Sequence, residues 1–258
     1  MFLVCFLSGV TTRGQAYVHE FGLNAAIFGL FGVSALVVIC LFLSLTNVLE
    51  ADRQPLSRTD VRLLTVIVVI NLAPSAILSW LCLTALALRE YFRPNQLAPL
   101  KRGAALMVGI TVPMFWSKIA FGLASSFILK ADAALVSILT GAEQIGNVVT
   151  LANGAGYLWI ADACSSFGNI SLAMLCWLMF MEYRGRAERT FADYFTCLFA
   201  CLNVVIINVT RISIMAKRPD LFEFVHGPLG ASIAGYISTI MVILVCNSGI
   251  KRGAKLAV

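Results

Sequence analysis

The chain has 258 residues, of which 60% are hydrophobic and 12% are charged, and its mean hydropathy is +0.89. Soluble globular domains are about half apolar and about a quarter charged, so this composition excludes an ordinary soluble domain and indicates a membrane protein. The net charge of +6 does not indicate a nucleic-acid partner, because basic cytoplasmic loops facing anionic lipid headgroups produce the same excess in an apolar chain. We therefore expect a single polytopic membrane domain over residues 1–258, with the lipid bilayer as a partner.

About six apolar runs predict transmembrane helices, since a segment of roughly 20 residues crosses the hydrocarbon core. In chain order they are Asn24–Asn47, Leu63–Leu88, Ala104–Leu129, Asn169–Tyr183, Tyr194–Val209 and Gly230–Cys246. Asn71 and Pro74 interrupt the second run and predict a kink. Lys118 lies within the third run, where a charge is costly, and it suggests two helical pieces. The expected fold class is all-α, an integral membrane bundle of about six transmembrane helices.

The apolar residues 1–10 have no assigned role. They lack the basic n-region and the small-residue cleavage site of a secretory signal. They belong either to the surface or to a short first span.

Between the third and fourth spans the pattern changes to short β-like segments. Asn147–Leu151 and Tyr157–Ile160 predict two strands, and Asn153–Gly154 between them is a hairpin turn signal. We expect this small hairpin just outside the bilayer. It leads directly to Cys164, which stands at the start of the fourth span.

The distribution of basic residues predicts how the bundle is oriented. The loops and tail on the side of the C-terminus hold more lysine and arginine than those on the other side, and the more basic side is cytoplasmic by the positive-inside rule. Cys164, Arg211 and His226 then lie together on the extracytoplasmic face of the plasma (inner) membrane.

These three residues stand at the ends of three successive spans and form a chemically sensible set. A thiolate is a strong nucleophile, a histidine moves protons near neutral pH, and an arginine binds a developing oxyanion. Each residue also has an ordinary explanation. Cys164 is then a packed small side chain, Arg211 a snorkelling anchor and His226 a polar loop residue.

The other cysteines do not suggest a metal site. All of them lie within apolar runs, where cysteine behaves as a small hydrophobe, and we expect Cys164 alone at the surface. No zinc-ligand spacing, phosphate-binding loop or dinucleotide fingerprint occurs. We therefore expect neither a metal nor a cofactor.

Three motifs resemble the exosortase/archaeosortase family of polytopic membrane cysteine enzymes. Here the motifs read Ala161-Asp-Ala-Cys-Ser-Ser, Asn208-Val-Thr-Arg and His226-Gly-Pro-Leu-Gly. The family's patterns, in the same order, are Ala-Cys-Ser-Gly, Asn-x-x-Arg and His-x-x-x-Gly. Ser166 replaces the family's glycine, and Gly168 stands where a basic residue is usual. The resemblance covers about residues 116–230, including the hairpin, within a core of residues 104–246. The N-terminal spans in residues 1–103 match nothing specific.

The resemblance implies a nucleophile at Cys164, an essential arginine at Arg211 and a histidine at His226. Asn208, Asp162 and Ser165 are candidate supporting residues. The implied activity is that of a cysteine transpeptidase or protease whose substrates are exported proteins with a C-terminal tail. Such a tail has a short recognition motif, Pro-Glu-Pro in the best-known group, then a hydrophobic helix and a basic cluster. The thiolate would form a thioester that an amine on a lipid or surface glycan, or water, resolves.

Two other classes of function stay open. A non-enzymatic membrane component of exopolysaccharide export or assembly would need no thiol. A small transporter would usually show internal repeats with paired broken helices, and we find no repeat. The recognition motif, the acceptor, the subfamily and the oligomeric state are not predicted.

Overall fold

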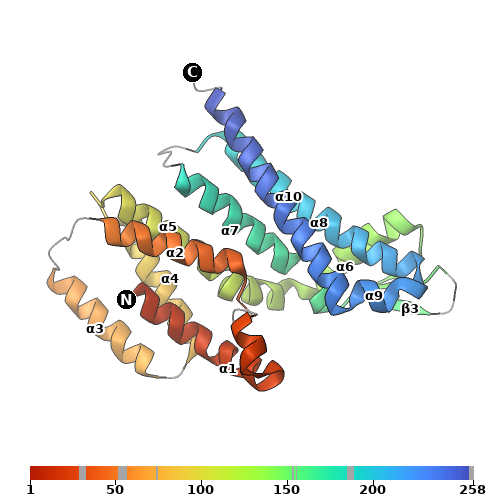
Figure 1. Ribbon diagram of the computed structural model, residues 1–258, viewed down its shortest axis with the longest axis horizontal. Helices are drawn as coiled ribbons and strands as arrows, with labels where there is room; N and C mark the ends of the chain where they lie inside the picture. The colour runs from red at the N-terminus through yellow and green to blue at the C-terminus, as the bar shows by residue number, and fades with distance from the viewer. Residues whose placement is uncertain are drawn as a thin grey trace. The chain divides into compact units, whose positions relative to one another are not determined.

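The computed structural model describes residues 1–28, 33–51, 57–73, 75–152, 154, 156–184 and 189–255, which are mostly helical (Figure 1). They form two compact units. The first is Met1–Phe115 with a short segment that begins at Glu182, and the second is Trp116–Met181 with the chain after the following loop. Each unit buries apolar side chains of its own, such as Leu83 in the first and Ile160 in the second.

Five helices make up the first unit. They are α1 (Phe2–Phe28), α2 (Ala35–Glu50), α3 (Arg58–Leu72), α4 (Ala76–Phe92) and α5 (Ala98–Thr111). Helix α5 packs against α2 and α4, and α1 packs against α4. The α2–α5 contact is close at Gly103, where a Cβ would lie 2.9 Å from the carbonyl oxygen of Ser44. The Ser44 hydroxyl donates to the Gly103 carbonyl at 2.7 Å, so a side chain at position 103 would push these helices apart.

The expected first span, Asn24–Asn47, is not one helix. Ser34 has an extended backbone with φ −61° and ψ 137°, and α2 begins only after it. The helical hydrogen bonds start at this residue, whose carbonyl accepts from the amides of Val37 and Val38. The 16 residues of α2 span about 24 Å at 1.5 Å per residue, which is less than the usual hydrocarbon thickness.

The expected second span, Leu63–Leu88, is also divided into two helices. Helix α3 ends at Leu72, and the C-cap residue Ala73 is extended. Helix α4 starts after Ser75, whose hydroxyl accepts from the Leu78 amide at 3.5 Å. A new helix with its own N-cap therefore begins where a kink was expected. Pro74, the residue expected to produce the kink, lies outside the described residues.

A charged cluster joins the start of α3 to the end of α4. Ser57 and Asp60 form a reciprocal capping box at the N-terminus of α3, and Arg89 and Arg93 from α4 both donate to the Asp60 carboxylate. The Arg89 hydrogen bond, assisted by Ser57, holds the pKa of Asp60 well below its usual range. The Asp60 carboxylate is buried, so its ion pairs with Arg89 and Arg93 connect α3 to α4 instead of lying on the protein surface.

We predict that this cluster makes the first unit sensitive to acid. Because the pKa of Asp60 is lower in the folded state, its stabilisation is complete above the unfolded pKa of about 4 and is lost as the pH falls below that value. In Asp60→Asn the unfolding temperature should be lower at pH 7, and its further fall in acid should be smaller. Thermal unfolding of the detergent-solubilised protein from pH 7 to pH 3 measures both effects.

Asp220→Asn is the matched control for this prediction. Asp220 also has a lowered pKa because of Arg218, but their ion pair is exposed to solvent and should contribute little. An acid profile of Asp60→Asn identical to that of wild type would contradict the role of the cluster.

The expected third span, Ala104–Leu129, lies within one longer helical run. Helix α5 leads through the π-helical turn η2 (Val112–Trp116) into α6 (Ser117–Thr140). Pro113 is part of η2, and a π-turn accommodates a residue that has no amide to donate. The two helical pieces expected here are thus joined by a widened turn. Gly141 ends α6 with a left-handed backbone at φ 72°.

A three-stranded antiparallel sheet follows α6 and confirms the predicted hairpin. Strand β2 (Val148–Thr150) pairs with β3 (Tyr157–Trp159), and the sequence did not predict β1 (Gln144–Ile145), which pairs with β2 on its other side. Gly154 in the hairpin connection has φ 67°, which suits glycine at a turn. Asn153, the other residue of the turn signal, lies outside the described residues.

The helices of the C-terminal half complete the second unit. They are α7 (Phe167–Tyr183), α8 (Phe191–Lys217), α9 (Phe222–His226) and α10 (Pro228–Lys255), with short 3₁₀ turns η3 (Asp162–Cys164) and η4 (Pro219–Leu221). Helix α8 packs against α10 and α6, and α8 and α10 run side by side in Figure 1.

Three helical segments within the described residues are long and apolar enough to cross a membrane. They are Ala98–Thr140, Phe191–Lys217 and Leu229–Gly249, while Ala35–Glu50 and Phe167–Tyr183 are apolar but shorter. The structure therefore supports a helical membrane protein but does not show six spans. The expected fourth span falls on the shorter helix α7.

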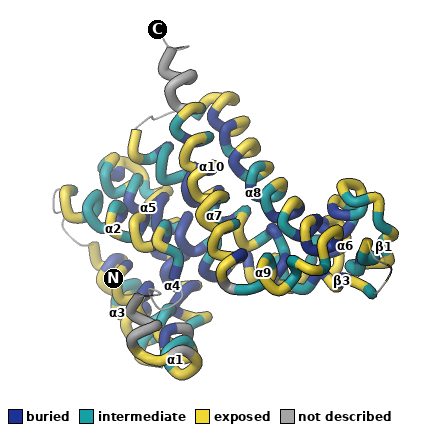
Figure 2. The backbone as a smooth tube through the Cα atoms, turned by 45° about the vertical axis from the view of Figure 1, so that its right-hand side comes forward, coloured by how far each residue is buried: buried dark blue, intermediate teal, exposed yellow. Residues whose placement is uncertain are grey.

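The surface of α10 fits a lipid environment. Figure 2 shows exposed residues along much of this helix, and its exposed side chains include Ile233, Ile237, Ile240 and Leu244. Aliphatic side chains of this kind are costly in water and favourable in a hydrocarbon phase. The exposed face of α10 is therefore consistent with contact to acyl chains.

Candidate active site

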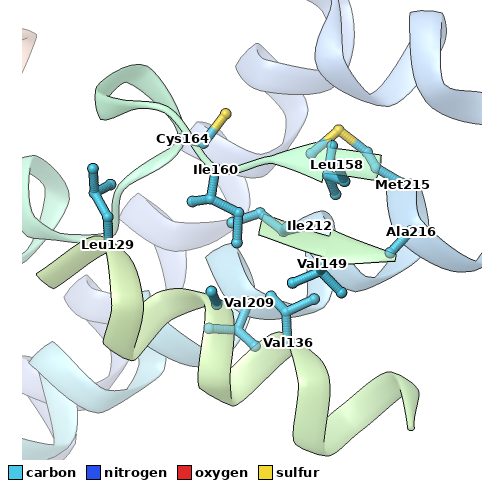
Figure 3. Packing of buried hydrophobic residues seen from close by; sticks show 11 residues of the cluster. Leu129, Val136, Val149, Leu158, Ile160, Cys164, Val209, Ile212, Met215 and Ala216 are labelled. Carbon is cyan, nitrogen blue, oxygen red and sulfur yellow. The ribbon is translucent and has the colours of Figure 1, made fainter. Parts of the chain in front are cut away.

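Cys164 lies in a buried apolar cluster formed by α6, the small sheet and α8. The strand β3 leads Ile160 into this cluster, where it packs with Ile212 of α8. Cys164 follows in η3 and is only 8% exposed, so the expectation of a surface thiol is wrong. The packing of the small sheet against the helices buries the residue. Figure 3 shows its sulfur pointing away from the aliphatic side chains of the cluster.

Asn208 connects α8 to the Cys164 segment. Its side-chain amide nitrogen donates to the Cys164 carbonyl at 2.7 Å and to the Ser166 hydroxyl at 3.1 Å. Asn208 is itself buried, and hydrogen bonds in such surroundings are strengthened by the low dielectric. Of the predicted supporting residues, Asn208 is the one that contacts the candidate nucleophile's own backbone.

Arg211 connects the same helix to α9. Its Nε donates to the Val225 carbonyl at 3.1 Å and one terminal nitrogen donates to the His226 carbonyl at 3.3 Å. Arg211 follows Asn208 by three residues, so both side chains lie on one face of α8. This face therefore holds the Cys164 segment at one turn and the His226 segment at the next.

The imidazole of His226 is exposed and stacks on Phe222. The two ring centroids are 5.1 Å apart with an interplanar angle of 8°. Phe222 and Val225 also pack against the cluster that contains Cys164. In the part of the chain that the structure describes, no hydrogen bond links the imidazole to the Cys164 thiol.

Asp162 and Ser165 flank Cys164 and line a cavity of about 230 Å³. Asp162 is exposed, and the Ser165 hydroxyl accepts from the Phe167 amide at 3.2 Å. The remaining lining residues come from the starts of α6 and α7 and are Ser117, Lys118, Phe121, Phe167 and Gly168. The cavity thus opens beside the candidate nucleophile and presents polar, cationic and aromatic groups.

The sequence reading missed Asp132. This acid of α6 is 5% exposed and accepts from the Ser166 amide at 3.2 Å and from the Ser166 hydroxyl at 3.0 Å. An acidic residue within an otherwise apolar stretch was the signal that could have identified it.

Gly230 permits α9 and α10 to pack closely. A Cβ at this position would lie 2.5 Å from the Phe224 carbonyl oxygen and 2.6 Å from that of Val225. The Val225 carbonyl is also the acceptor for Arg211. The glycine at the end of the His-x-x-x-Gly motif therefore has a steric reason in this fold.

We predict that Gly230→Ala destabilises the second unit and disturbs the Arg211 contact. The added methyl group would collide with main-chain atoms, and overpacking of this kind typically costs about 1–3 kcal/mol. Gly235→Ala in the same helix is the control, because nothing lies within 4 Å of its Cβ position. Comparison of the two thermal unfolding midpoints tests this, and equal midpoints would contradict it.

The described residues contain no group of three or more histidine, cysteine, aspartate or glutamate side chains arranged to hold a metal ion. The functional groups at the site are a thiol, an imidazole, a guanidinium, carboxylates and amides.

Comparison of the chain with protein-family models, with curated proteins and with solved structures found no match.

Proposed function

We propose that this chain is a membrane-embedded cysteine transpeptidase or protease that cleaves the C-terminal sorting tail of exported proteins. The observation that carries the proposal is the double contact of α8. Asn208 holds the backbone of Cys164, and Arg211, one turn later, holds the backbone of His226. The segments that carry the thiol and the imidazole are thereby both held at the end of α8 that carries the guanidinium.

The chemistry follows from these groups. The Cys164 thiol gives its proton to His226, and the resulting thiolate attacks the scissile carbonyl carbon, whose oxygen becomes an oxyanion. Collapse of this intermediate breaks the peptide bond and releases the hydrophobic helix as an amine, which takes a proton from His226. The remaining thioester is then attacked by an acceptor amine or by water, whose proton passes to the imidazole.

Arg211 is suited to bind the oxyanion. A guanidinium has five N–H groups, and the two main-chain carbonyls engage only some of them. The other N–H groups are available to a developing negative charge, an interaction typically worth about 3–4 kcal/mol per donor in the transition state. The anchored guanidinium would need little rearrangement during the reaction.

The exposure of His226 and the burial of Cys164 require a movement on substrate binding. Catalytic hydrogen bonds are often absent or long in substrate-free enzymes and form in the complex. An incoming tail helix would approach laterally from the bilayer, on the extracytoplasmic side of the plasma (inner) membrane. The acceptor would be an amine of a lipid or surface glycan, or water.

Capture of the acyl-enzyme tests this function. The purified protein is incubated with a tail-bearing substrate and examined for a covalent adduct that hydroxylamine releases. We expect the adduct in wild type and none in Cys164→Ala, and its accumulation in His226→Ala would assign the imidazole to the resolution of the thioester rather than to its formation. Absence of any adduct, together with unchanged tail processing in cells that carry Cys164→Ser, would refute the proposal.

A non-enzymatic membrane component is the second candidate. Two observations favour it. The Cys164 side chain is buried in an apolar cluster, and Arg211 is engaged by main-chain carbonyls as a structural anchor would be. For this function Cys164→Ser should retain full activity in export or assembly.

A further inference from the structure

A chain of buried hydrogen bonds runs from α6 to the backbone of Cys164. The Asp132 carboxylate accepts from both the amide and the hydroxyl of Ser166. The Ser166 hydroxyl in turn contacts the side-chain amide of Asn208, which also donates to the Cys164 carbonyl. Asp132, Ser166 and Asn208 are all buried. Three elements, α6, the start of α7 and α8, therefore meet at the residues just after Cys164.

We infer that Asp132 is a positioning residue, which sets the orientation of Cys164 through Ser166 and Asn208. This inference rests on the proposed function, because it concerns how the nucleophile is held for attack. The Ser166 hydroxyl donates to Asp132 Oδ1. Its lone pairs then accept from Asn208. The carboxylate thus orients the Ser166 hydroxyl, which leaves the hydroxyl oxygen free to accept from Asn208.

The location of the carboxylate explains why it is stable in a buried position. Ser166 immediately precedes α7, and its carbonyl accepts from the Ile170 amide in the first turn of that helix. A negative charge at a helix N-terminus interacts favourably with the unpaired amides and the helix dipole. The two hydrogen bonds from Ser166 offset the cost of desolvating the carboxylate.

Ser166 gives this chain a connection that the family pattern lacks. The resemblance places a glycine at this position, and a glycine has no hydroxyl to join a carboxylate to an amide. Here the hydroxyl bridges Asp132 on α6 and Asn208 on α8. Loss of the bridge should free the segment from Cys164 to Ser166 while both helices remain in place.

The experiment compares Asp132→Asn with Asp193→Asn. Asp193 is a close match, because it is also buried, lies in the same unit and accepts from the amide and hydroxyl of one residue, Thr190, at a helix N-terminus. Among the residues that the structure describes, no hydrogen bond joins the Asp193 side chain to the Cys164 segment. Asp132→Asn preserves size and leaves a neutral amide in place of the acceptor that Ser166 requires.

Two readouts separate positioning from general destabilisation. For tail cleavage we expect Asp132→Asn to lower kcat by about tenfold or more with KM changed by less than about threefold, since an orienting interaction acts on the chemical step. For alkylation by a small neutral maleimide, followed by mass spectrometry of the cysteine peptides, Cys164 should react faster than in wild type. Cys176, a buried cysteine of α7, should be unchanged in the same sample.

Serine variants complete the test. Ser166→Ala should reproduce both effects of Asp132→Asn, and the double variant should lower kcat no further than either single variant. Ser166→Thr, which keeps the hydroxyl, should retain the wild-type kcat and the wild-type rate of Cys164 alkylation. Wild-type kcat and wild-type Cys164 alkylation in Asp132→Asn would overturn the inference. So would an equal rise at Cys164 and Cys176, or the same Cys164 response in Asp193→Asn. If wild type cleaves no tail, the proposed function fails. The rate of Cys164 alkylation relative to that of Cys176 still decides whether Asp132 positions Cys164.

Discussion

Cys164→Ala is expected to abolish tail cleavage and the covalent adduct while the protein stays folded. Removal of the nucleophile from a serine protease costs about 10⁶-fold in kcat, so the residual activity should be undetectable. The loss of stability should be near the typical value for a point substitution, about 1 kcal/mol, because alanine retains the Cβ and removes one sulfur that points away from the aliphatic side chains. Cleavage rate and thermal midpoint are measured on the same preparation.

Cys176→Ala is the control for this prediction. Cys176 is buried in the same unit and is not one of the candidate site residues, so Cys176→Ala should keep tail cleavage and adduct formation. Equal activity in Cys164→Ala and wild type would show that the thiol is not the nucleophile. The non-enzymatic function would then be favoured.

Arg211→Ala is expected to damage both the chemistry and the fold. Loss of an oxyanion donor typically lowers kcat by about 10²–10³-fold. The substitution also removes the donors to the carbonyls of Val225 and His226, and a typical intramolecular hydrogen bond contributes about 0.5–1.5 kcal/mol to stability. Arg211→Lys keeps the charge but cannot reproduce the rigid fork that meets two acceptors, so we expect only a small recovery of kcat.

The two effects of Arg211 are measured separately. Hydrogen exchange of the α9 amides reports whether this helix is still held, and cleavage kinetics report on catalysis. Arg218→Ala is the matched control, because Arg218 is exposed and pairs only with the neighbouring Asp220 among the described residues. Faster exchange in α9 with an unchanged kcat would assign Arg211 a purely structural role.

The local features of the site were predictable from the sequence. Short β-like segments and the Asn153–Gly154 turn signal predicted the hairpin, which the structure confirms as β2 and β3. The Asn208-Val-Thr-Arg motif identified Asn208 and Arg211 as candidate site residues at the end of the fifth expected span. These predictions depend only on residues that are close along the chain.

The burial of Cys164 and the part played by Asp132 were not predictable in this way. Cys164 becomes buried because the small sheet packs with α6 and α8 in one apolar cluster, and Asp132 contacts Ser166 over a separation of 34 residues. Such contacts depend on which helices pack together. The hydropathy pattern alone does not determine which helices pack together.

The helix boundaries were likewise predicted only in part from the sequence. Composition identified the apolar runs, but hydropathy averages over many residues and did not register the extended backbone at Ser34 and Ala73 that divides two of them. The sequence by itself determined a helical membrane protein and a hairpin before Cys164. Only the tertiary structure decided that Asn208 meets the Cys164 backbone and Arg211 the His226 backbone, because hydrogen bonds between distant segments form only after the helices have packed.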